Sequence, residues 1–295
     1  MRKDNKDLLK KIGEDNSLMN KKNLIVEIES NVKQTLKKIK LSKNEKIFVA
    51  LSGGKDSSVT AYLLKKFEYR IEGIHLDLKI GKYSEDCLNA VKKLCKDLDI
   101  KLHVYDIKKE MGSGICYLRS AIQSRKEKGK LKNCAICGVI KKWILNKEAR
   151  KLKADKIATG HNLDDEAQTF LMNIFKGSPE LSANSGPASK NISDKKLIPR
   201  IKPLFYVLEN DLRNYSKLKK LPVVYEKCPC ALDSYRIELR NFLNSLDEKD
   251  KVNIVKNFDI VSEKIQKADS KLNYCKICNE PSRKEVCKKC ELMRV

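Results

Sequence analysis

The chain has 295 residues, with 63 Lys and Arg against 39 Asp and Glu, a formal net charge of +24. Its length suits one large domain with an appendage or two domains, and 41% hydrophobic residues can fill a real core, which excludes wholesale disorder. No apolar run approaches the ~20 residues of a membrane-spanning helix. The polar start at residues 1–6 lacks the apolar stretch of a secretion signal. These observations predict a cytoplasmic protein without a membrane segment.

Short apolar strands alternate with helical patterns through most of the chain. Residues 1–22 are Lys-rich with weak periodicity, and apolar residues at spacings of three and four predict an amphipathic helix over 24–39. Strands are expected at 46–51, 71–78, 102–107, 156–159 and 197–204, and helices at 57–67, 84–98, 139–152 and 164–175. This alternation predicts a Rossmann-like parallel α/β sheet.

Composition divides the chain into four expected segments. A basic segment with the amphipathic helix occupies 1–42, and the α/β domain occupies 43–222, including a polar loop at 177–196 that is typical of a mobile or functional connection. A mainly helical extension follows at 223–271, and a cysteine-rich module at 272–295. The last segment has the composition of a small separate unit.

The loop between the first α/β strand and its helix predicts a phosphate site. Its residues Ser52-Gly53-Gly54-Lys55-Asp56-Ser57 place two glycines where backbone amides can turn toward an anion. The spacing excludes a Walker A loop. The S-G-G-x-D-S pattern resembles the PP-loop, or N-type ATP pyrophosphatase, superfamily. That likeness implies cleavage of ATP between its α and β phosphates and transfer of AMP to a substrate oxygen.

The same resemblance assigns a nucleotide site at the carboxyl ends of neighbouring strands, where parallel sheets bind ligands. Ser52 to Ser57 would bind the pyrophosphate portion, with Lys55 stabilising phosphoryl charge. The implied lining residues are Ala50, Ser52, Gly53, Gly54, Lys55, Asp56, Ser57, His75, Asp77 and Gly160.

A cluster of acids lies at an expected helix start after Gly160. Asp164, Asp165 and Glu166 would occupy the first helical turn, where negative charge is favourable. Simple helix capping is one interpretation. Next to a phosphate loop, the acids could instead hold Mg²⁺ on ATP or act as general acid and base. His161, His75 and His103 are more typical of structural positions.

The chain contains 11 cysteines, and C-x2-C units in a reducing cytosol are typical of metal or redox sites. Cys134 and Cys137 lie one helical turn apart before the expected helix at 139–152, and Cys228 and Cys230 follow far downstream. Three thiolates from two segments could hold an iron–sulfur cluster with one open iron, and four would give a closed site. A redox pair, a zinc site or unrelated buried cysteines are alternatives. Cys87, Cys95 and Cys116 are interpreted as small buried hydrophobes.

The C-terminal cysteines predict structural zinc. Cys275-x2-Cys278-x8-Cys287-x2-Cys290 has the paired spacing with which four thiolates close a tetrahedron. So short a segment has too little apolar sequence to fold without metal.

These motifs together resemble the TtcA/TtuA family of tRNA 2-thiolation enzymes, closest to the archaeal and eukaryotic 2-thiouridine synthetase group, over residues 24–295. The resemblance rests on the glycine loop, Asp77 to Ser84, the C-x2-C pair, Gly160 to Thr169, and Cys-Pro followed by Arg236 and Arg240. It implies a PP-loop ATPase domain with a C-terminal zinc ribbon. It also implies a 4Fe-4S cluster on Cys134, Cys137 and Cys228, and it favours Asp165 over Asp164 as the catalytic acid.

The implied reaction is adenylation of the C2 oxygen of a uridine in tRNA, followed by its replacement with sulfur. The expected cofactors are ATP, Mg²⁺, the 4Fe-4S cluster and Zn²⁺, and the expected partners are tRNA, a sulfur donor (sulfide or a ubiquitin-like sulfur-carrier protein) and a second copy of the chain. The charge of +24 agrees with a folded RNA as partner.

Three questions remain open at the level of sequence. Residues 1–40 lack Cys and His, so the N-terminal zinc module common in this family has no counterpart there. Cys230 stands where a non-ligand residue is expected, and a thiol there could close the cluster. The alternatives in function are another PP-loop nucleobase ligase, of lysidine or amidation type, and a non-catalytic zinc-containing RNA-binding protein.

Overall fold

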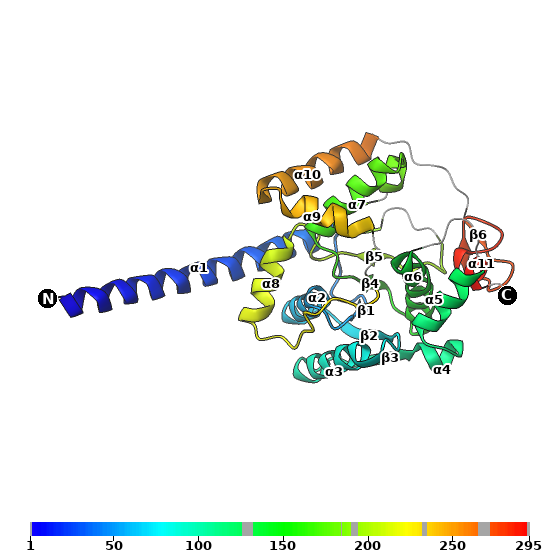
Figure 1. The fold of residues 1–295 in the computed structure, drawn as a ribbon, viewed down its shortest axis with the longest axis horizontal. Helices are drawn as coiled ribbons and strands as arrows, with labels where there is room; N and C mark the ends of the chain where they lie inside the picture. Colours follow the sequence, from blue (N-terminus) through cyan, green and yellow to red (C-terminus); the bar gives the residue numbers. More distant parts are fainter. Residues whose placement is uncertain are drawn as a thin grey trace.

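A parallel sheet forms the centre of the protein in this computed structural model (Figure 1). Its strands are β1 (Ile47–Ala50), β2 (Ile71–Asp77), β3 (Leu102–Asp106), β4 (Lys156–Ala158) and β5 (Arg200–Ile201), in the order β3-β2-β1-β4-β5. The structure describes residues 2–125, 132–183, 185–189, 194–231, 235–264 and 272–293, with side chains of the first helix described from residue 19 onward. This confirms the predicted α/β fold with a parallel sheet.

Strand order reverses between β1 and β4, and this reversal positions the site. The chain builds β1, β2 and β3 outward in one direction and then crosses back to place β4 on the other side of β1. The connections after β1 and β4 therefore leave the carboxyl edge of the sheet side by side and in opposite directions. Such a switch point opens the crevice in which open parallel sheets bind ligands.

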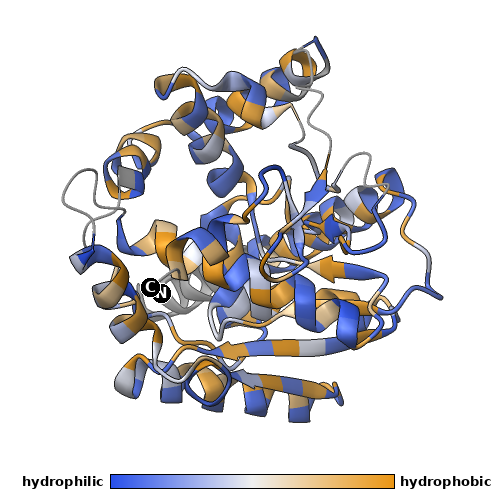
Figure 2. Ribbon diagram, turned by 90° about the vertical axis from the view of Figure 1, so that its right-hand side faces the viewer, coloured by the Kyte–Doolittle hydropathy of each residue, from blue (hydrophilic) through white to orange (hydrophobic). Residues whose placement is uncertain are grey.

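Helices cover both faces of the sheet, and apolar residues follow the strands and the helix faces turned toward them (Figure 2). Along β1, Ile47 and Val49 face one layer and Phe48 faces the other, because successive strand side chains alternate. The first layer comprises α1 (Arg2–Lys38), α2 (Lys55–Lys66), α3 (Gly81–Asp97) and α8 (Glu209–Leu218), which share one apolar core.

The opposite layer carries the cysteine-bearing helices. Its elements are α4 (Ile107–Met111), α5 (Ile115–Ser124) and α6 (Asn133–Lys151). Ile115 and Leu118 of α5 pack with Ile136 and Ile140 of α6, so the two helices form one unit. Leu292 of α11 (Lys288–Met293) completes this core.

A helical lobe stands over the carboxyl edge of the sheet. It comprises α7 (Leu163–Phe175), α9 (Tyr235–Asn244) and α10 (Glu248–Lys264), with Phe170 stacked on Phe258 at 3.9 Å between ring centroids. A short 3-10 helix, η1 (Pro179–Ser182), follows α7. The C-terminal module contains β6 (Asn273–Tyr274), β7 (Pro281–Ser282) and α11.

Several element boundaries differ from the predictions. Helix α6 begins at Asn133 rather than 139, so Cys134 and Cys137 lie within its first turns and not before it. The expected strand at 197–204 contracts to Arg200–Ile201, since Pro199 and Pro203 cannot donate to a strand ladder. Helix α8 falls before the segment expected to be helical, and 223–231 contains no helix.

No helix among the residues that the structure describes has the length and apolar character needed to cross a membrane.

Candidate active site and thiol centre

The glycine loop closes on itself at the end of β1. The Ser52 amide donates to Ser57 Oγ at 3.1 Å, and Ser57 Oγ donates to the Gly54 carbonyl at 3.0 Å. Gly53 has φ of +85°, and a Cβ there would lie 2.8 Å from the Cα of Cys87. Only glycine fits this position. The loop then runs directly into α2, whose N-terminus has no side-chain cap. Uncapped amides at a helix start are suited to binding an anion.

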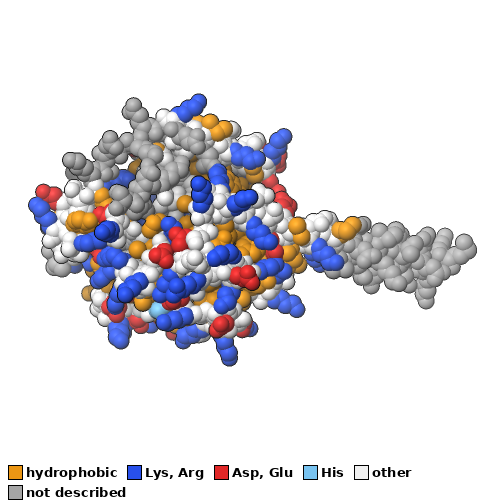
Figure 3. All heavy atoms as spheres, turned by 180° about the vertical axis from the view of Figure 1, so that it is seen from behind, with side chains coloured by type: hydrophobic (Ala, Val, Ile, Leu, Met, Phe, Trp, Pro, Cys, Tyr) orange, Lys and Arg blue, Asp and Glu red, His pale blue; other side chains and the backbone are white. Residues whose placement is uncertain are grey.

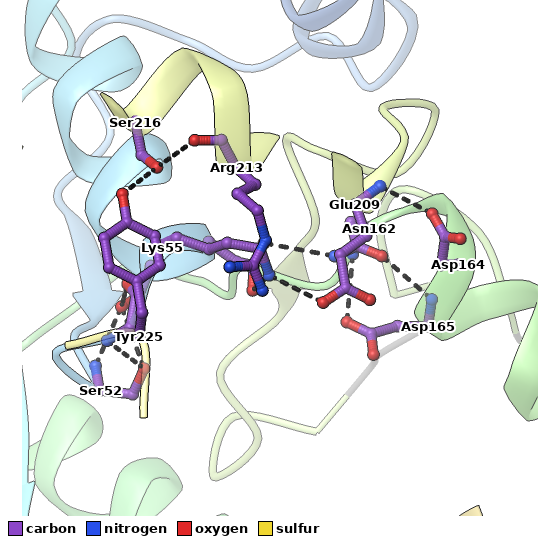
Figure 4. Close-up of polar contacts among 12 residues, drawn as sticks. Ser52, Lys55, Asn162, Asp164, Asp165, Glu209, Arg213, Ser216 and Tyr225 are labelled. Atoms are coloured by element: carbon purple, nitrogen blue, oxygen red, sulfur yellow. Dashed lines mark hydrogen bonds and ion pairs between the residues drawn. The ribbon is translucent and has the colours of Figure 1, made fainter. Parts of the chain in front are cut away.

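Lys55 carries the central charge of the site (Figure 4). Its Nζ lies 3.0 Å from Asp56 Oδ2 and 3.0 Å from Glu209 Oε1, which the fold brings from α8. Burial works to lower the pKa of Lys55, but the two carboxylates outweigh it and raise the pKa. Burial also works to raise the pKa of Glu209, yet Lys55 lowers it. The lysine is therefore fully protonated at the end of the phosphate loop.

Asp165 lies beside this charge group, and Asp164 points elsewhere. Asn162 caps α7 by accepting from the Asp165 amide at 3.0 Å, and its Nδ2 donates to Asp56 Oδ1 at 3.3 Å. Burial raises the pKa of Asp165, which pairs with Arg240 at 3.4 Å. Asp164 instead accepts from the Glu209 amide at 2.7 Å and pairs with Lys251 at 3.1 Å. The geometry thus gives Asp165 the position facing the loop and gives Asp164 a supporting one.

His75 and Asp77 occupy the neighbouring end of β2. His75 is buried, its Nδ1 lies 2.8 Å from the Leu51 carbonyl, and its Nε2 has no partner among the described residues. Asp77 accepts from Lys79 Nζ at 2.7 Å. His75 therefore holds the residue that follows β1, and half-buried Ala50 is the last residue of that strand.

Gly160 lets β4 approach the loop. A Cβ on Gly160 would lie 2.7 Å from the Asp56 carbonyl carbon and 2.8 Å from the Ser57 amide nitrogen, so the start of α2 would have to shift. We expect Gly160→Ala to raise the KM for ATP about tenfold and to cost ~1–3 kcal/mol of stability, since overpacked cores lose that much. ATP-dependent AMP release and thermal unfolding measure both effects. Gly138→Ala is the control, because a Cβ there meets open space; equal behaviour of the two variants would contradict the prediction.

The cysteines of the α/β domain form a second centre beside the first. Cys134 and Cys137 lie on α6, and Cys228 lies on the segment that follows α8. Cys228 is close enough to Cys134 and to Cys87 for the charged forms of these thiols to affect one another. The Cys228 sulfur accepts from the Cys230 amide. Among the described residues, the sulfurs of Cys134, Cys137 and Cys228 do not all lie within 4.8 Å of one another, as the ligands of a single metal ion would. A cubane cluster spreads its thiolate ligands more widely than one ion does, so an all-thiol set on two segments fits such a group.

Sequence and structure differ over the remaining thiols. Cys87 and Cys95 are buried as expected, and burial raises the pKa of Cys95 to about 11. Cys116 is only half-buried, and its Sγ lies 3.6 Å from the Sγ of Cys230. It is therefore not an isolated hydrophobe.

The C-terminal cysteines converge on one point. The Sγ atoms of Cys275, Cys278, Cys287 and Cys290 all lie within 4.8 Å of one another. A tetrahedron with zinc–sulfur bonds of about 2.3 Å has edges of about 3.8 Å, and the Cys278 to Cys287 separation is 3.6 Å. The four thiols therefore fit a closed zinc site.

One important residue was missed by sequence reasoning. Glu209 was overlooked because α8 was not recognised, although Glu209 and Asp211 after Leu208 are typical of an acidic first helical turn. His161 was expected to be structural; it is exposed, and its Nδ1 lies 2.9 Å from Thr159 Oγ1.

Comparison with known proteins gives a consistent result. The family model described as a PP-loop domain matches residues 24–246. The chain is 38% identical over 270 residues to a tRNA-5-methyluridine(54) 2-sulfurtransferase of Pyrococcus horikoshii, covering 89% of this chain and 83% of that protein. It is 33% identical over 263 residues to the tRNA 2-thiolation protein NcsA of Haloferax volcanii, covering 83% and 80%.

A solved structure shares the fold as well. The U34-tRNA thiolase NcsA of Methanococcus maripaludis, determined with its [4Fe-4S] cluster, superimposes with a TM-score of 0.77 at 31% sequence identity. The match covers 92% of this chain and 88% of that one.

Proposed function

Because the chain belongs to the PP-loop family and, within it, to the tRNA 2-thiolation enzymes, we propose that it replaces the C2 oxygen of a uridine in tRNA with sulfur, giving 2-thiouridine. ATP would first adenylate that oxygen, which is otherwise a poor leaving group, and AMP would then depart as sulfur attacks. Uridine 34 and uridine 54 both suit this chemistry.

One contact supports the proposal most directly. The Val224 amide donates to the Gly53 carbonyl at 2.9 Å, so the segment that carries Cys228 is hydrogen-bonded to the phosphate loop itself. Cys87, whose backbone fills the space beside Gly53, lies near Cys228 in turn. An ATP site at the loop and a thiol centre at Cys228 would therefore be neighbours, as coupled adenylation and sulfur transfer require.

The loop residues perform the first half of the reaction. The α2 amides and the Ser52 and Ser57 hydroxyls bind the pyrophosphate portion, while Lys55 stabilises charge that develops on the departing phosphates. Asp56 and Asp165, whose pKa values burial raises, stand where Mg²⁺ on ATP would gather carboxylate oxygens. Asp165 is also placed for general acid–base work.

The cysteines would serve the second half. Cys134, Cys137 and Cys228 would hold the 4Fe-4S cluster, which when bound supplies the site that carries sulfur. Sulfide or a ubiquitin-like sulfur-carrier protein would be the donor. α6 fixes the first two thiols one turn apart, and the hydrogen bond from Val224 fixes the third relative to the loop.

A group of cations near the carboxyl end of β4 is suited to RNA phosphates. Lys142 is exposed on α6, and Arg200 donates to its carbonyl at 3.4 Å. Arg236 and Lys202 lie close enough for their charges to act on Lys142, so four positive charges lie in one region. Lys and Arg also spread over the face seen in Figure 3. Phosphate groups would relieve this repulsion, and binding of tRNA would weaken steeply with salt.

The remaining assignments complete the proposal. The C-terminal ribbon at 272–295 would carry one structural Zn²⁺ as a small module of its own, and the protein would work as a homodimer in the cytoplasm. Two rivals remain: a lysidine-type or amidating ligase needs no cluster, and a non-catalytic RNA-binding protein needs no Lys55.

Substitution of Cys228 tests the proposal. We expect Cys228→Ala to abolish 2-thiouridine, measured by mass spectrometry of nucleosides from digested tRNA, while pyrophosphate release from ATP in the adenylation step persists. The reason is that only sulfur transfer needs the thiol. Cys95→Ala is the control, because Cys95 is buried away from both centres. Full thiolation by Cys228→Ala would refute the cluster mechanism, whereas tRNA without any 2-thiouridine after incubation with the wild type would favour the ligase.

A further inference from the structure

Cys230 and Cys116 form a close contact that the thiolation reaction does not use. Their sulfurs lie 3.6 Å apart although 114 residues separate them in sequence. Cys116 lies in the first turn of α5, and Cys230 lies on the segment after β5. A disulfide bond is about 2.05 Å long, so the two sulfurs need to approach by roughly 1.5 Å to bond.

Residues of both α5 and α6 surround Cys230. Arg119 of α5 lies close enough to the Cys230 thiol for the two to interact, and Asn133 Nδ2 of α6 donates to the Cys230 carbonyl at 3.3 Å. Arg119 also lies near Cys137, so its charge acts on both sets of thiols. The sulfur at 3.6 Å from the Cys230 sulfur is that of Cys116.

We propose that Cys116 and Cys230 are an oxidisable pair that closes to an intrachain disulfide, leaving Cys134, Cys137 and Cys228 as the thiols for metal. With a small disulfide such as glutathione disulfide as oxidant, the Cys230 thiolate attacks one glutathione sulfur and releases the other half as a thiolate. The Cys116 thiolate then displaces the second glutathione. One sulfur–sulfur bond breaks and one forms, and the two protons from the cysteines pass to the two glutathione molecules.

The disulfide would restrict the movement of the segment that carries Cys228. α5 packs on α6, which carries Cys134 and Cys137. Linking Cys230 to α5 would therefore tie the segment of Cys228 to the same unit, through the stiff Pro229 between the two cysteines. The pair is thus a modification site that sets how freely Cys228 can move relative to Cys134 and Cys137.

Disulfide mapping on the full-length protein tests the pair. The protein is treated with glutathione disulfide without oxygen, free thiols are alkylated, and trypsin is added without reductant. The relevant peptides are 110–119, containing Cys116, 133–141, containing Cys134 and Cys137, and 228–236, containing Cys228 and Cys230. We expect most chains to yield 110–119 joined to 228–236, with fragmentation placing the bond on Cys230.

Matched variants decide the assignment. Cys116→Ser should remove the cross-link and leave glutathione on Cys230, Cys230→Ser should remove it, and Cys95→Ser should change nothing. Iron content after anaerobic reconstitution should be the same in Cys230→Ser as in wild type. Complete alkylation of Cys116 in the treated wild type, a bond from Cys230 to peptide 133–141, or loss of iron in Cys230→Ser would each overturn the proposal. Protein that carries zinc but no iron should give the same map of disulfide-linked peptides. A failure of the thiolation proposal can therefore be told apart from a failure of the disulfide proposal.

Discussion

Replacing Lys55 with Met is expected to reduce ATP-dependent AMP and pyrophosphate release at least about 100-fold, a typical loss when one charge-stabilising donor is removed. In the wild type, Nζ of Lys55 balances Asp56 and Glu209 at 3.0 Å each. Without the ammonium, two carboxylates face the incoming phosphates with no compensating charge. The defect therefore combines lost stabilisation with new repulsion.

A second lysine on the same helix provides the control. Lys65→Met removes an exposed ammonium near Asp99, and turnover should stay within twofold of wild type. Thermal unfolding of both variants separates catalysis from folding, because an unpaired Asp56 also costs stability. Turnover of Lys55→Met within threefold of wild type, with tRNA and ATP saturating, would remove Lys55 from the phosphate site.

Removal of metal from the C-terminal ribbon is expected to unfold residues 272–293 while leaving the sheet intact. Structural zinc supplies on the order of 10 kcal/mol to small modules of this kind. The chain has a single tryptophan, Trp143, which packs against the cysteine cluster from α6. A chelator should therefore release one zinc per chain and shift the tryptophan emission to longer wavelength.

The same readout applies to a ligand variant. Cys278→Ser should bind zinc weakly and show the shifted emission without a chelator, whereas Cys95→Ser should match wild type. Glu280 of the ribbon pairs with Arg150 of α6. When the ribbon unfolds, backbone amides around Arg150 should therefore exchange their hydrogens faster. Unchanged emission after complete zinc release would show that the thiols close without metal.

Sequence patterns predicted the sheet well because its strands are short, buried and bounded by glycine or charged turns. β1 with the glycine loop and α2 has both a hydrophobic run and a distinctive motif, so local signals suffice. The strand expected at 197–204 was overestimated because Ile198 and Leu204 pack in the cores on the faces of the sheet without joining the ladder, which Pro199 and Pro203 interrupt. Such long-range packing leaves no periodic signal.

The candidate site was predictable only where a motif marks it. Ser52 to Ser57 and the paired cysteines were found from spacing, whereas Glu209 and the partnership of Cys116 with Cys230 depend on tertiary contacts. Asp164 and Asp165 are neighbours with the same chemistry, and only the packing of α7 between the loop and α10 gives them different partners. Sequence can name such acids but cannot orient them.

The ion pair between Lys55 and Glu209 also bears on how the protein is made, because it joins residues 154 positions apart. β1 gains β2 early in synthesis, but it pairs with β4 only after residue 158 has emerged, and α8 follows later still. Contacts so distant in sequence form late. A nascent chain therefore carries its glycine loop for most of its synthesis without the carboxylate that balances Lys55, so ATP chemistry is expected to begin only once α8 has packed against α2.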